Sequence, residues 1–409
     1  MLPPASTLGH SLRRIVGFCV IATRAVVMRA STSAATCVHT HTPSPRTSPK
    51  WRARREPPGR HVGSRGNSHL PAHSSNEYDT ALLTAELDSL IEETRNAGKN
   101  ATTHVVAFSG GVDSSLCAYL VFKAFGDFDC VRSGLNNVYA AIGVSPALPT
   151  SLLEQAREVA KQIGIPLREV QTTEGQVPEY VKNEGDSCFY CKNTLYETLS
   201  ALASDAEGQN GARLNAHSGQ SQEATTGAHQ TPPIIQMYNG TNLEDTSDTT
   251  RLGLVSAANH GVVSPLISTP KSRVRELAKL VSLPNWDLAA APCLRSRLAI
   301  GVEATVDTLR SVEMAEEKVR HLLKIKPNEN MRVRVMKENV SAFYDSHSAS
   351  INDSFKAKQP AVIELDPFHL SVMESDGVIR ETLRVELGKC GLAVVETRGF
   401  RSGSVAKQT

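Results

Sequence analysis

The chain has 409 residues, of which 40% are hydrophobic and 21% charged, a composition that suits a soluble protein with room for two packed domains. Its net charge of +2 is unevenly distributed: residues 1–76 contain eleven Arg and Lys and one acidic residue, Glu56, so the rest carries a net charge of −8. A net acidic body has no general attraction for phosphate polymers, and no apolar run reaches the roughly 18 residues of a membrane span. We therefore expect neither a nucleic-acid nor a membrane partner.

Residues 1–76 are rich in Arg, Ser, Thr and Pro and contain no acidic residue before Glu56. This composition is typical of an organelle transit peptide, and we expect a mitochondrial rather than a plastid destination. A disordered tail, or a true start at Met28, is the alternative. The eight cysteines are too dispersed for a disulfide-stapled secreted domain, which favours a reducing compartment.

Between residues 78 and 292, short apolar strands alternate with amphipathic helices. Ser151 with Glu154 is expected to cap one helix, and Thr269 another, with Pro270 as its first residue. Residues 204–233 are polar and rich in Gly, Ser and Gln, which predicts a disordered or mobile surface insertion. The alternation predicts an α/β fold, a doubly wound parallel sheet covered on both faces. The expected strands are 104–109, 138–144, 166–172 and 234–238, and the expected helices 79–97, 114–125, 151–164, 187–203 and 271–281.

The regular alternation of strands and helices ends near Cys293. Residues 293–400 predict a smaller α+β domain that contributes to substrate binding or oligomerisation. Its expected elements are helix 304–323, strands 331–335 and 361–365, a mostly helical segment 367–389 and a last strand 392–396.

A glycine-rich turn follows the first predicted strand, with the sequence Ser109-Gly110-Gly111-Val112-Asp113-Ser114-Ser115. Two glycines let the backbone approach a ligand closely, and the free N–H groups at the start of the next helix form an anion site. An acidic residue beside a phosphate implies a bridging Mg²⁺, so Asp113 is a predicted magnesium contact. The other predicted pyrophosphate-binding residues are Ser109, Gly110, Gly111, Ser114 and Ser115. A plain tight turn with a serine cap is the alternative.

This string resembles the PP-loop of the ATP pyrophosphatase superfamily, whose domain is adenine nucleotide alpha hydrolase-like and is shared with NAD and GMP synthetases. The resemblance implies cleavage of ATP between the α- and β-phosphates and attachment of AMP to a substrate. Polar residues at the carboxyl ends of the strands are further candidates. They are Asn242 and Asp245 for the nucleotide, and Asp248 and Arg251 for the substrate.

Several later segments, taken in order, resemble the LarE family of ATP-dependent sacrificial sulfur transferases. They are Cys188-Phe189-Tyr190-Cys191-Lys192, Gly240-Thr241-Asn242-Leu243-Glu244-Asp245, Leu283-Pro284-Asn285-Trp286-Asp287 and Pro292-Cys293-Leu294-Arg295-Ser296-Arg297. The resemblance implies a small-molecule substrate, a pyridinium carboxylate mononucleotide that is adenylated and then converted to a thiocarboxylate. The chain departs from the family pattern at Arg295, where the family has Ala, and at Ala299-Ile300-Gly301. These departures leave the identity of the sulfur acceptor open.

The resemblance also implies the source of sulfur. Catalytic residues are Cys188, Cys191 and Cys293: the sulfur comes from Cys293 itself, or the three thiols hold a 4Fe–4S cluster with one iron open to an extra sulfide. All three cysteines are present, which favours the cluster. A zinc site or two buried thiols is the alternative for Cys188 and Cys191. The neighbouring charges of Arg295 and Arg297 are expected to stabilise the Cys293 thiolate.

Substrate-binding residues follow from the same resemblance, namely Ser296, Arg297 and Glu316. Alternation places Arg332 and Arg334 on one strand face, where they would clamp a phosphate or carboxylate or form an exposed charged face. The family pattern favours the clamp. The chain is expected to form a homo-oligomer.

Two rival functions remain: a PP-loop tRNA thiolase, which also combines such a loop with a Cys-x-x-Cys pair, and a nucleotide-binding regulator without turnover.

Overall fold

A computed structural model describes residues 74–126, 137–217, 234–247, 251–337 and 358–401, and all of them belong to one compact unit. The predicted N-terminal tail lies outside these ranges up to residue 73. Within the described ranges, no helix combines the length and the apolar character needed to cross a bilayer.

Four parallel strands form the first sheet in the order β3-β2-β1-β4. The strand order reverses beside β1, because the chain adds β2 and β3 on one side of it and β4 on the other. In such sheets the loops after the strands on either side of the reversal diverge and leave a crevice for ligands. The strands are β1 (Thr103–Ala107), β2 (Val138–Val144), β3 (Leu167–Gln171) and β4 (Ile235–Tyr238).

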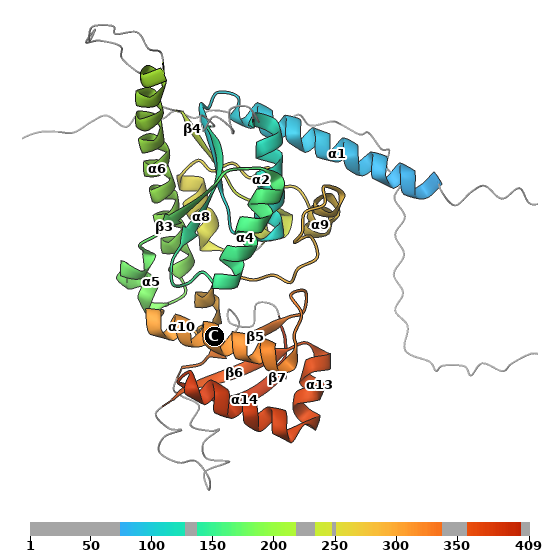
Figure 1. The fold of residues 1–409 in the computed structure, drawn as a ribbon, viewed down its shortest axis with the longest axis vertical. Coiled ribbons are helices and arrows are strands. Elements are labelled where there is room, and N and C mark those ends of the chain that lie inside the picture. The colour runs from blue at the N-terminus through green and yellow to red at the C-terminus, as the bar shows by residue number, and fades with distance from the viewer. Residues whose placement is uncertain (1–73, 127–136, 218–233, 248–250, 338–357, 402–409) are drawn as a thin grey trace, which may run out of the picture. The chain divides into compact units, whose positions relative to one another are not determined.

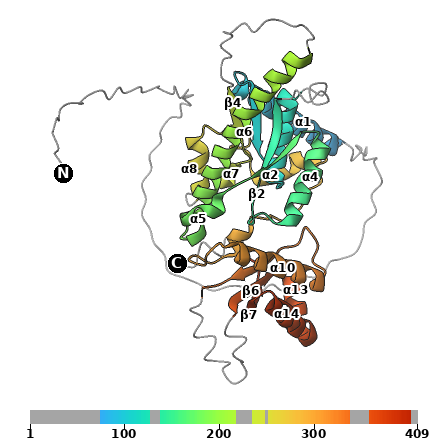
Figure 2. The same cartoon turned by 60° about the vertical axis from the view of Figure 1, so that its left-hand side comes forward.

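Helices cover both faces of this sheet (Figures 1 and 2), as the alternation of β1 requires. Val106 packs in the core with α1 (Ser74–Gly98), α2 (Val112–Phe125), α4 (Thr150–Ile163) and α9 (Lys271–Leu280). Val105 packs in the opposite core with α6 (Ser187–His217) and α8 (Leu252–Asn259). The predicted α/β fold class is confirmed.

A second, three-stranded sheet follows in the order β5-β6-β7, with β5 antiparallel and β7 parallel to β6. Its own apolar core contains Val312, Val333 and Ile363. The predicted strands and helices of this region are present, while the predicted domain boundary at 292/293 stays a prediction. The elements are α10 (Val306–Leu323), β5 (Met331–Val335), β6 (Gln359–Leu365), α13 (Pro367–Ser375), α14 (Gly377–Lys389) and β7 (Leu392–Gly399).

Four short helices complete the described part of the chain. All of them lie in connections for which the sequence predicted neither a helix nor a strand. They are η1 (Glu174–Gln176), α5 (Pro178–Lys182), α7 (Leu243–Thr246) and η2 (Leu294–Arg297).

Two predicted helix caps are wrong. Helix α4 begins two residues earlier than the Ser151 capping box requires, with Pro149 at the N-cap position and no side-chain cap. Helix α9 has Pro270 as its N-cap rather than as its first residue, so the Thr269 hydroxyl caps nothing. In both cases a proline with fixed φ sets the helix start and takes the place of a polar cap.

Two other segments differ from expectation in extent. Helix α6 continues to His217, so the first half of the expected insertion 204–233 is helical, and residues 218–233 lie outside the described part. Its Ala, Glu, Gln and Leu residues are good helix formers, which explains the extension. The segment 367–389 is two helices, because the Asp376 carboxylate accepts hydrogen bonds from the N–H groups of Val378 and Ile379 and starts a new helix.

A close backbone approach joins the loops that follow β1 and β4. A Cβ atom on Gly240 would lie 2.5 Å from both the carbonyl carbon of Asp113 and the backbone nitrogen of Ser114. Only glycine allows the two loops to touch at this point.

We expect Gly240→Ala to lower the free energy of unfolding by about 1–3 kcal/mol, because the added methyl group forces two backbones apart. Urea denaturation followed by circular dichroism measures this change. Gly399→Ala is the matched control, since a Cβ there meets nothing within 4 Å. Equal losses in the two variants would contradict the close approach.

Candidate functional site

The loop between β1 and α2 is held by its own serine hydroxyls. Gly110 has a φ of 74°, a left-handed conformation that favours glycine. Ser114 Oγ donates to the Gly111 carbonyl at 2.9 Å and accepts from the Ser109 N–H at 3.2 Å. Ser115 Oγ donates to the same carbonyl at 2.9 Å. These hydroxyls shape the loop, so the first backbone N–H groups of α2 remain as the donors for an anion.

Two amides that the sequence analysis did not assign fix the Gly110 carbonyl. Gln155 Nε2 and Asn285 Nδ2 each donate to it at 2.8 Å. Asn285 also donates to Ser115 Oγ at 2.9 Å and is 1% exposed. Asn285 lies in the Leu283–Asp287 segment, whose resemblance to a family motif was the available signal.

Asp113 connects the first loop to two others. Its carboxylate accepts a hydrogen bond from Asn242 Nδ2 at 3.1 Å and forms an ion pair with Lys271. The side chain keeps 25% of its area exposed, so it is accessible to a metal ion bound to phosphate oxygens. Lys271 is a third site residue, after Gln155 and Asn285, that was not predicted from the sequence, since nothing in its spacing marks it.

Asn242 is oriented by a reciprocal cap at the start of α7. Its side chain accepts from the Asp245 N–H, and the Asp245 carboxylate accepts from the Asn242 N–H. Asp245 also pairs with Arg251. Of the four candidates after β4, Asn242, Asp245 and Arg251 therefore lie together, and Asp248 lies outside the described residues.

The three candidate thiols come from two segments. Cys188 and Cys191 lie in the first turn of α6, and Cys293 is the N-cap residue of η2. All three are free, and Cys188 is exposed. Arg295 donates to Cys188 Sγ at 2.7 Å and to Asn183 Oδ1 at 3.0 Å.

Electrostatics couple these thiols. Burial raises the pKa of Cys191 to about 12; Lys192 opposes this rise, and Cys293 and Cys188 add to it. Burial alone lowers the pKa of Arg295, but the neighbouring sulfur atoms, Cys188 foremost, raise it above its usual value. Arg295 therefore hydrogen-bonds to Cys188 and also acts electrostatically on Cys293, while the predicted stabilisation of the Cys293 thiolate stays a prediction.

Within the described part of the chain, no group of three or more His, Cys, Asp and Glu side chains is arranged to hold a single metal ion. A zinc site at the Cys188 and Cys191 pair therefore has no third and fourth ligand among these residues.

The segment that carries Cys293 is anchored to the edge of the first sheet. The Leu294 N–H donates to the carbonyl of Ala147, three residues after β2, at 2.8 Å. The Cys293 carbonyl accepts from Ser296 Oγ at 2.7 Å and from an Arg297 NH group at 2.9 Å. Cys293 is thus placed at the carboxyl end of β2, next to the strand that leads into the glycine loop.

Arg297 and Glu316 are buried against each other. Two Arg297 nitrogens meet the two carboxylate oxygens at 3.0 and 3.1 Å, and Arg297 is 2% exposed. Glu316 also accepts from the Val333 N–H at 3.1 Å. Both were predicted to bind substrate, but their contacts favour a positioning role, in which they hold the Cys293 segment against β5.

Arg332 and Arg334 share one face of β5, as alternation predicts, but that face is buried: the two residues are 4% and 6% exposed. The exposed-face alternative is wrong. Arg334 pairs with Glu364 at 2.7 Å, whereas Arg332 donates to the carbonyls of Met331 and Ala290. Burial and the positive charge of Arg297 lower the pKa of Arg332 to about 10. Arg332 is therefore the better candidate for an anionic substrate group.

Glu316→Gln is expected to destabilise the protein by about 3–5 kcal/mol, because it leaves the buried Arg297 without its counter-charge. Chemical denaturation measures the loss. Glu169→Gln is the matched control: Glu169 pairs with Arg157 at the surface, where loss of the pair costs at most about 1 kcal/mol. A similar small effect in both variants would contradict the positioning role.

The sequence of this chain matches one protein family and two known proteins. Residues 102–183 match the family described as the tRNA methyl transferase HUP domain, a span from β1 to the end of α5 that includes the glycine loop. The uncharacterized protein slr1717 of Synechocystis is 32% identical over 264 residues, which cover 63% of this chain and 85% of the relative. The pyridinium-3,5-bisthiocarboxylic acid mononucleotide synthase of Lactiplantibacillus plantarum is 26% identical over 220 residues, or 53% of this chain and 67% of the relative.

Proposed function

Since the chain belongs to the family of slr1717, within the PP-loop ATP pyrophosphatase superfamily, we propose that it is an ATP-dependent sulfur transferase. Its substrate in this proposal is a pyridinium carboxylate mononucleotide, as the name of the Lactiplantibacillus relative suggests. The observation that carries the proposal is the position of Cys293: its segment is bonded to the loop after β2, beside the strand that leads into the glycine loop.

In the first step the substrate carboxylate attacks the α-phosphorus of ATP. A carboxyl O–P bond forms, and the bond between the α-phosphorus and the bridging oxygen breaks, with its electron pair leaving on pyrophosphate. The first N–H groups of α2 would bind the pyrophosphate, and Lys271 would add positive charge beside it. One accessible carboxylate, Asp113, suits a Mg²⁺ ion that takes its other ligands from phosphates and water.

In the second step a sulfur nucleophile attacks the carbonyl carbon of the acyl adenylate, and AMP leaves with the electron pair of the C–O bond. If Cys293 is the donor, its Cβ–S bond then breaks as the Cα proton is lost, which leaves dehydroalanine and a thiocarboxylate. Arg295 would stabilise negative charge at the neighbouring thiols.

The same thiols suit a 4Fe–4S cluster, which we favour as the sulfur source. Three thiolates on two segments match a cluster with one iron left open, which would supply a bound sulfide when present. Cys188, Cys191 and Cys293 would hold it. Arg295 and Lys192 would offset the negative charge of the thiolates.

Two variants separate the two steps of the reaction. Asp113→Asn is expected to slow pyrophosphate release about 100-fold, because it removes the charge that holds the metal–phosphate group. Cys293→Ser is expected to keep pyrophosphate release and lose the thiocarboxylate. A coupled pyrophosphate assay and mass spectrometry of the acid product measure the two steps. Asp79→Asn, on the exposed start of α1, is the control. Unchanged nucleotide cleavage in Asp113→Asn would sink the proposal.

The cluster has its own test. After anaerobic purification, Cys188→Ala is expected to lose iron and acid-labile sulfide but to retain ATP binding. Cys390→Ala, which removes a thiol buried in the second core, should keep both. Equal iron content in Cys188→Ala and the parent protein would exclude the cluster and leave Cys293 as the donor.

A tRNA thiolase is the second candidate, favoured by the description of the HUP-domain family that matches residues 102–183. The net acidic body argues against it. Pyrophosphate release that depends on added tRNA, and not on a pyridinium acid, would select it. ATP binding without any release would select a nucleotide-binding regulator.

A further inference from the structure

Asn183 ends α5 in a left-handed backbone conformation, with φ 56° and ψ 51°. Asparagine adopts this conformation more readily than most residues that carry a Cβ atom. The residue is 1% exposed, and the chain reaches Ser187, where α6 begins, shortly after it. The position of Asn183 therefore decides how the start of α6, which carries Cys188, is placed against α5.

The side-chain amide of Asn183 holds a turn that begins 116 residues further along the chain. Its Nδ2 atom donates to the carbonyls of Ala299 and Val302, at 2.9 and 3.1 Å. Its backbone carbonyl accepts from the Gly301 N–H at 2.9 Å. Three hydrogen bonds thus join Asn183 to this turn, which comes shortly after η2 and the Cys293 segment.

The side-chain oxygen of the same amide holds Arg295. One guanidinium nitrogen donates to Asn183 Oδ1 at 3.0 Å, and another donates to Cys188 Sγ at 2.7 Å. The planar guanidinium fixes the angle between these two bonds. Burial lowers the pKa of Arg295, but Cys188 and Cys293 raise it, because both sulfur atoms lie near its charge. Asn183 thus orients a cation that acts on both thiol segments.

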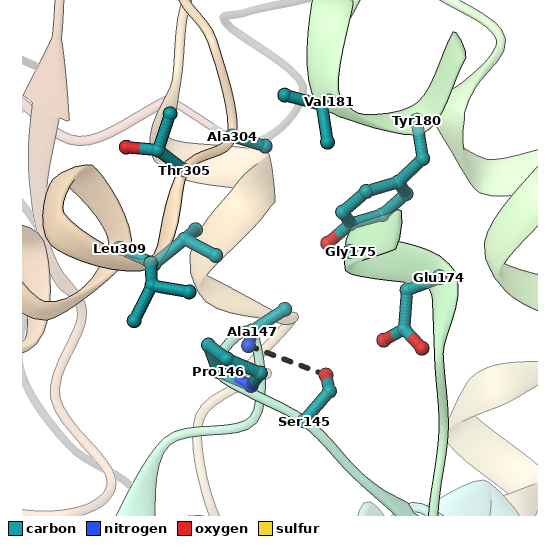
Figure 3. A pocket seen from close by; sticks show the side chains of 11 residues that line it. Ser145, Pro146, Ala147, Glu174, Gly175, Tyr180, Val181, Ala304, Thr305 and Leu309 are labelled. Carbon is teal, nitrogen blue, oxygen red and sulfur yellow. Dashed lines mark hydrogen bonds between the residues drawn. The ribbon is translucent and has the colours of Figure 1, made fainter. Parts of the chain in front are cut away.

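The bonding between α5 and the chain after η2 continues beyond this amide. The Ala304 N–H donates to the Val181 carbonyl at 2.8 Å, and Figure 3 shows both side chains at the wall of one cavity. This bond involves no side chain, so it remains when only the amide of Asn183 is altered. The two segments are therefore expected to stay in contact in variants of Asn183.

We propose that Asn183 is a positioning residue for sulfur transfer, and that its amide sets the distance between Cys188 and Cys293. An amide that uses both its donors and its acceptor in buried hydrogen bonds has one orientation, and it transmits that orientation to its partners. In the proposed reaction the thiols act on one acyl group or hold one cluster, which requires a fixed spacing. The inference rests on the proposed function for this consequence, but the spacing itself needs neither ATP nor substrate.

Labelling with dibromobimane tests the spacing, because the reagent links two thiols and becomes fluorescent only when both have reacted. Peptide mapping gives the amounts of the Cys188–Cys293 and Cys188–Cys191 products. The second product is an internal control, since both of its thiols lie near the start of α6. Asn183→Gly keeps the left-handed backbone and removes the amide. We expect it to lower the ratio of the first product to the second roughly fivefold, because the reacting thiols lose their alignment.

Two further variants separate the amide from the backbone. Asn183→Asp should give an intermediate ratio, because a carboxylate keeps the acceptor for Arg295 but cannot donate to the turn carbonyls. Lys324→Gly is the matched control: Lys324 ends α10 in the same left-handed conformation with its side chain exposed, so the parent ratio should be retained. Labelling is done below the melting temperature of each variant, so that loss of the fold does not contribute.

The two reaction steps connect the spacing to the proposed function. Asn183→Gly should release pyrophosphate at the parent rate and form roughly tenfold less thiocarboxylate, because a displaced sulfur atom attacks poorly. A parent protein that releases no pyrophosphate would contradict the proposed function alone, since the ratio of linked products still reports the spacing. An unchanged ratio in Asn183→Gly, an equal loss of both products, or no Cys188–Cys293 product in the parent would each overturn the inference.

Discussion

The carboxylate of Asp113 holds together three segments that lie far apart in the chain. It accepts from Asn242 after β4 and pairs with Lys271 at the start of α9, while its own backbone touches Gly240. Each contact constrains the others, because Asn242 is itself fixed by its cap with Asp245. These contacts all hold the glycine loop in the conformation seen here, and a loop held in place by the protein loses less conformational entropy when a ligand binds.

A second constraint lies behind the thiol segment, where buried charges are balanced in pairs. Arg297 is neutralised by Glu316, and Arg334 by Glu364, which also accepts from Arg398. Arg332 has no such carboxylate partner among the described residues and donates to backbone carbonyls instead. Buried ion pairs contribute little net stability but fix geometry strongly, because breaking either one leaves an uncompensated charge. The paired arginines therefore position the Cys293 segment, and the unpaired one remains available to an anion.

The fold was largely predictable because its signals are local. Periodicity predicted every strand of both sheets and most of the long helices, though not α8, and the glycine string predicted the loop after β1. The roles of Arg297 and Glu316 were not predictable, since a sequence does not reveal that two charged residues nineteen positions apart satisfy each other. Lys271, Gln155 and Asn183 were missed for the same reason: their importance comes from the loops they face, and no spacing marks that.

Parallel topology explains why these features gather at one edge. Every strand of the first sheet ends on the same side, so the loops after β1, β2, β3 and β4 bring the glycine loop, the anchor of Cys293, Glu174 and Asn242 to the same end of the sheet. The helices bury the apolar side chains on both faces of the sheet, and buried polar groups without a protein partner are open to an ordered water or a ligand. Among the described residues, buried Arg332 forms no ion pair and donates to backbone carbonyls, so its charge favours an anionic group of a ligand.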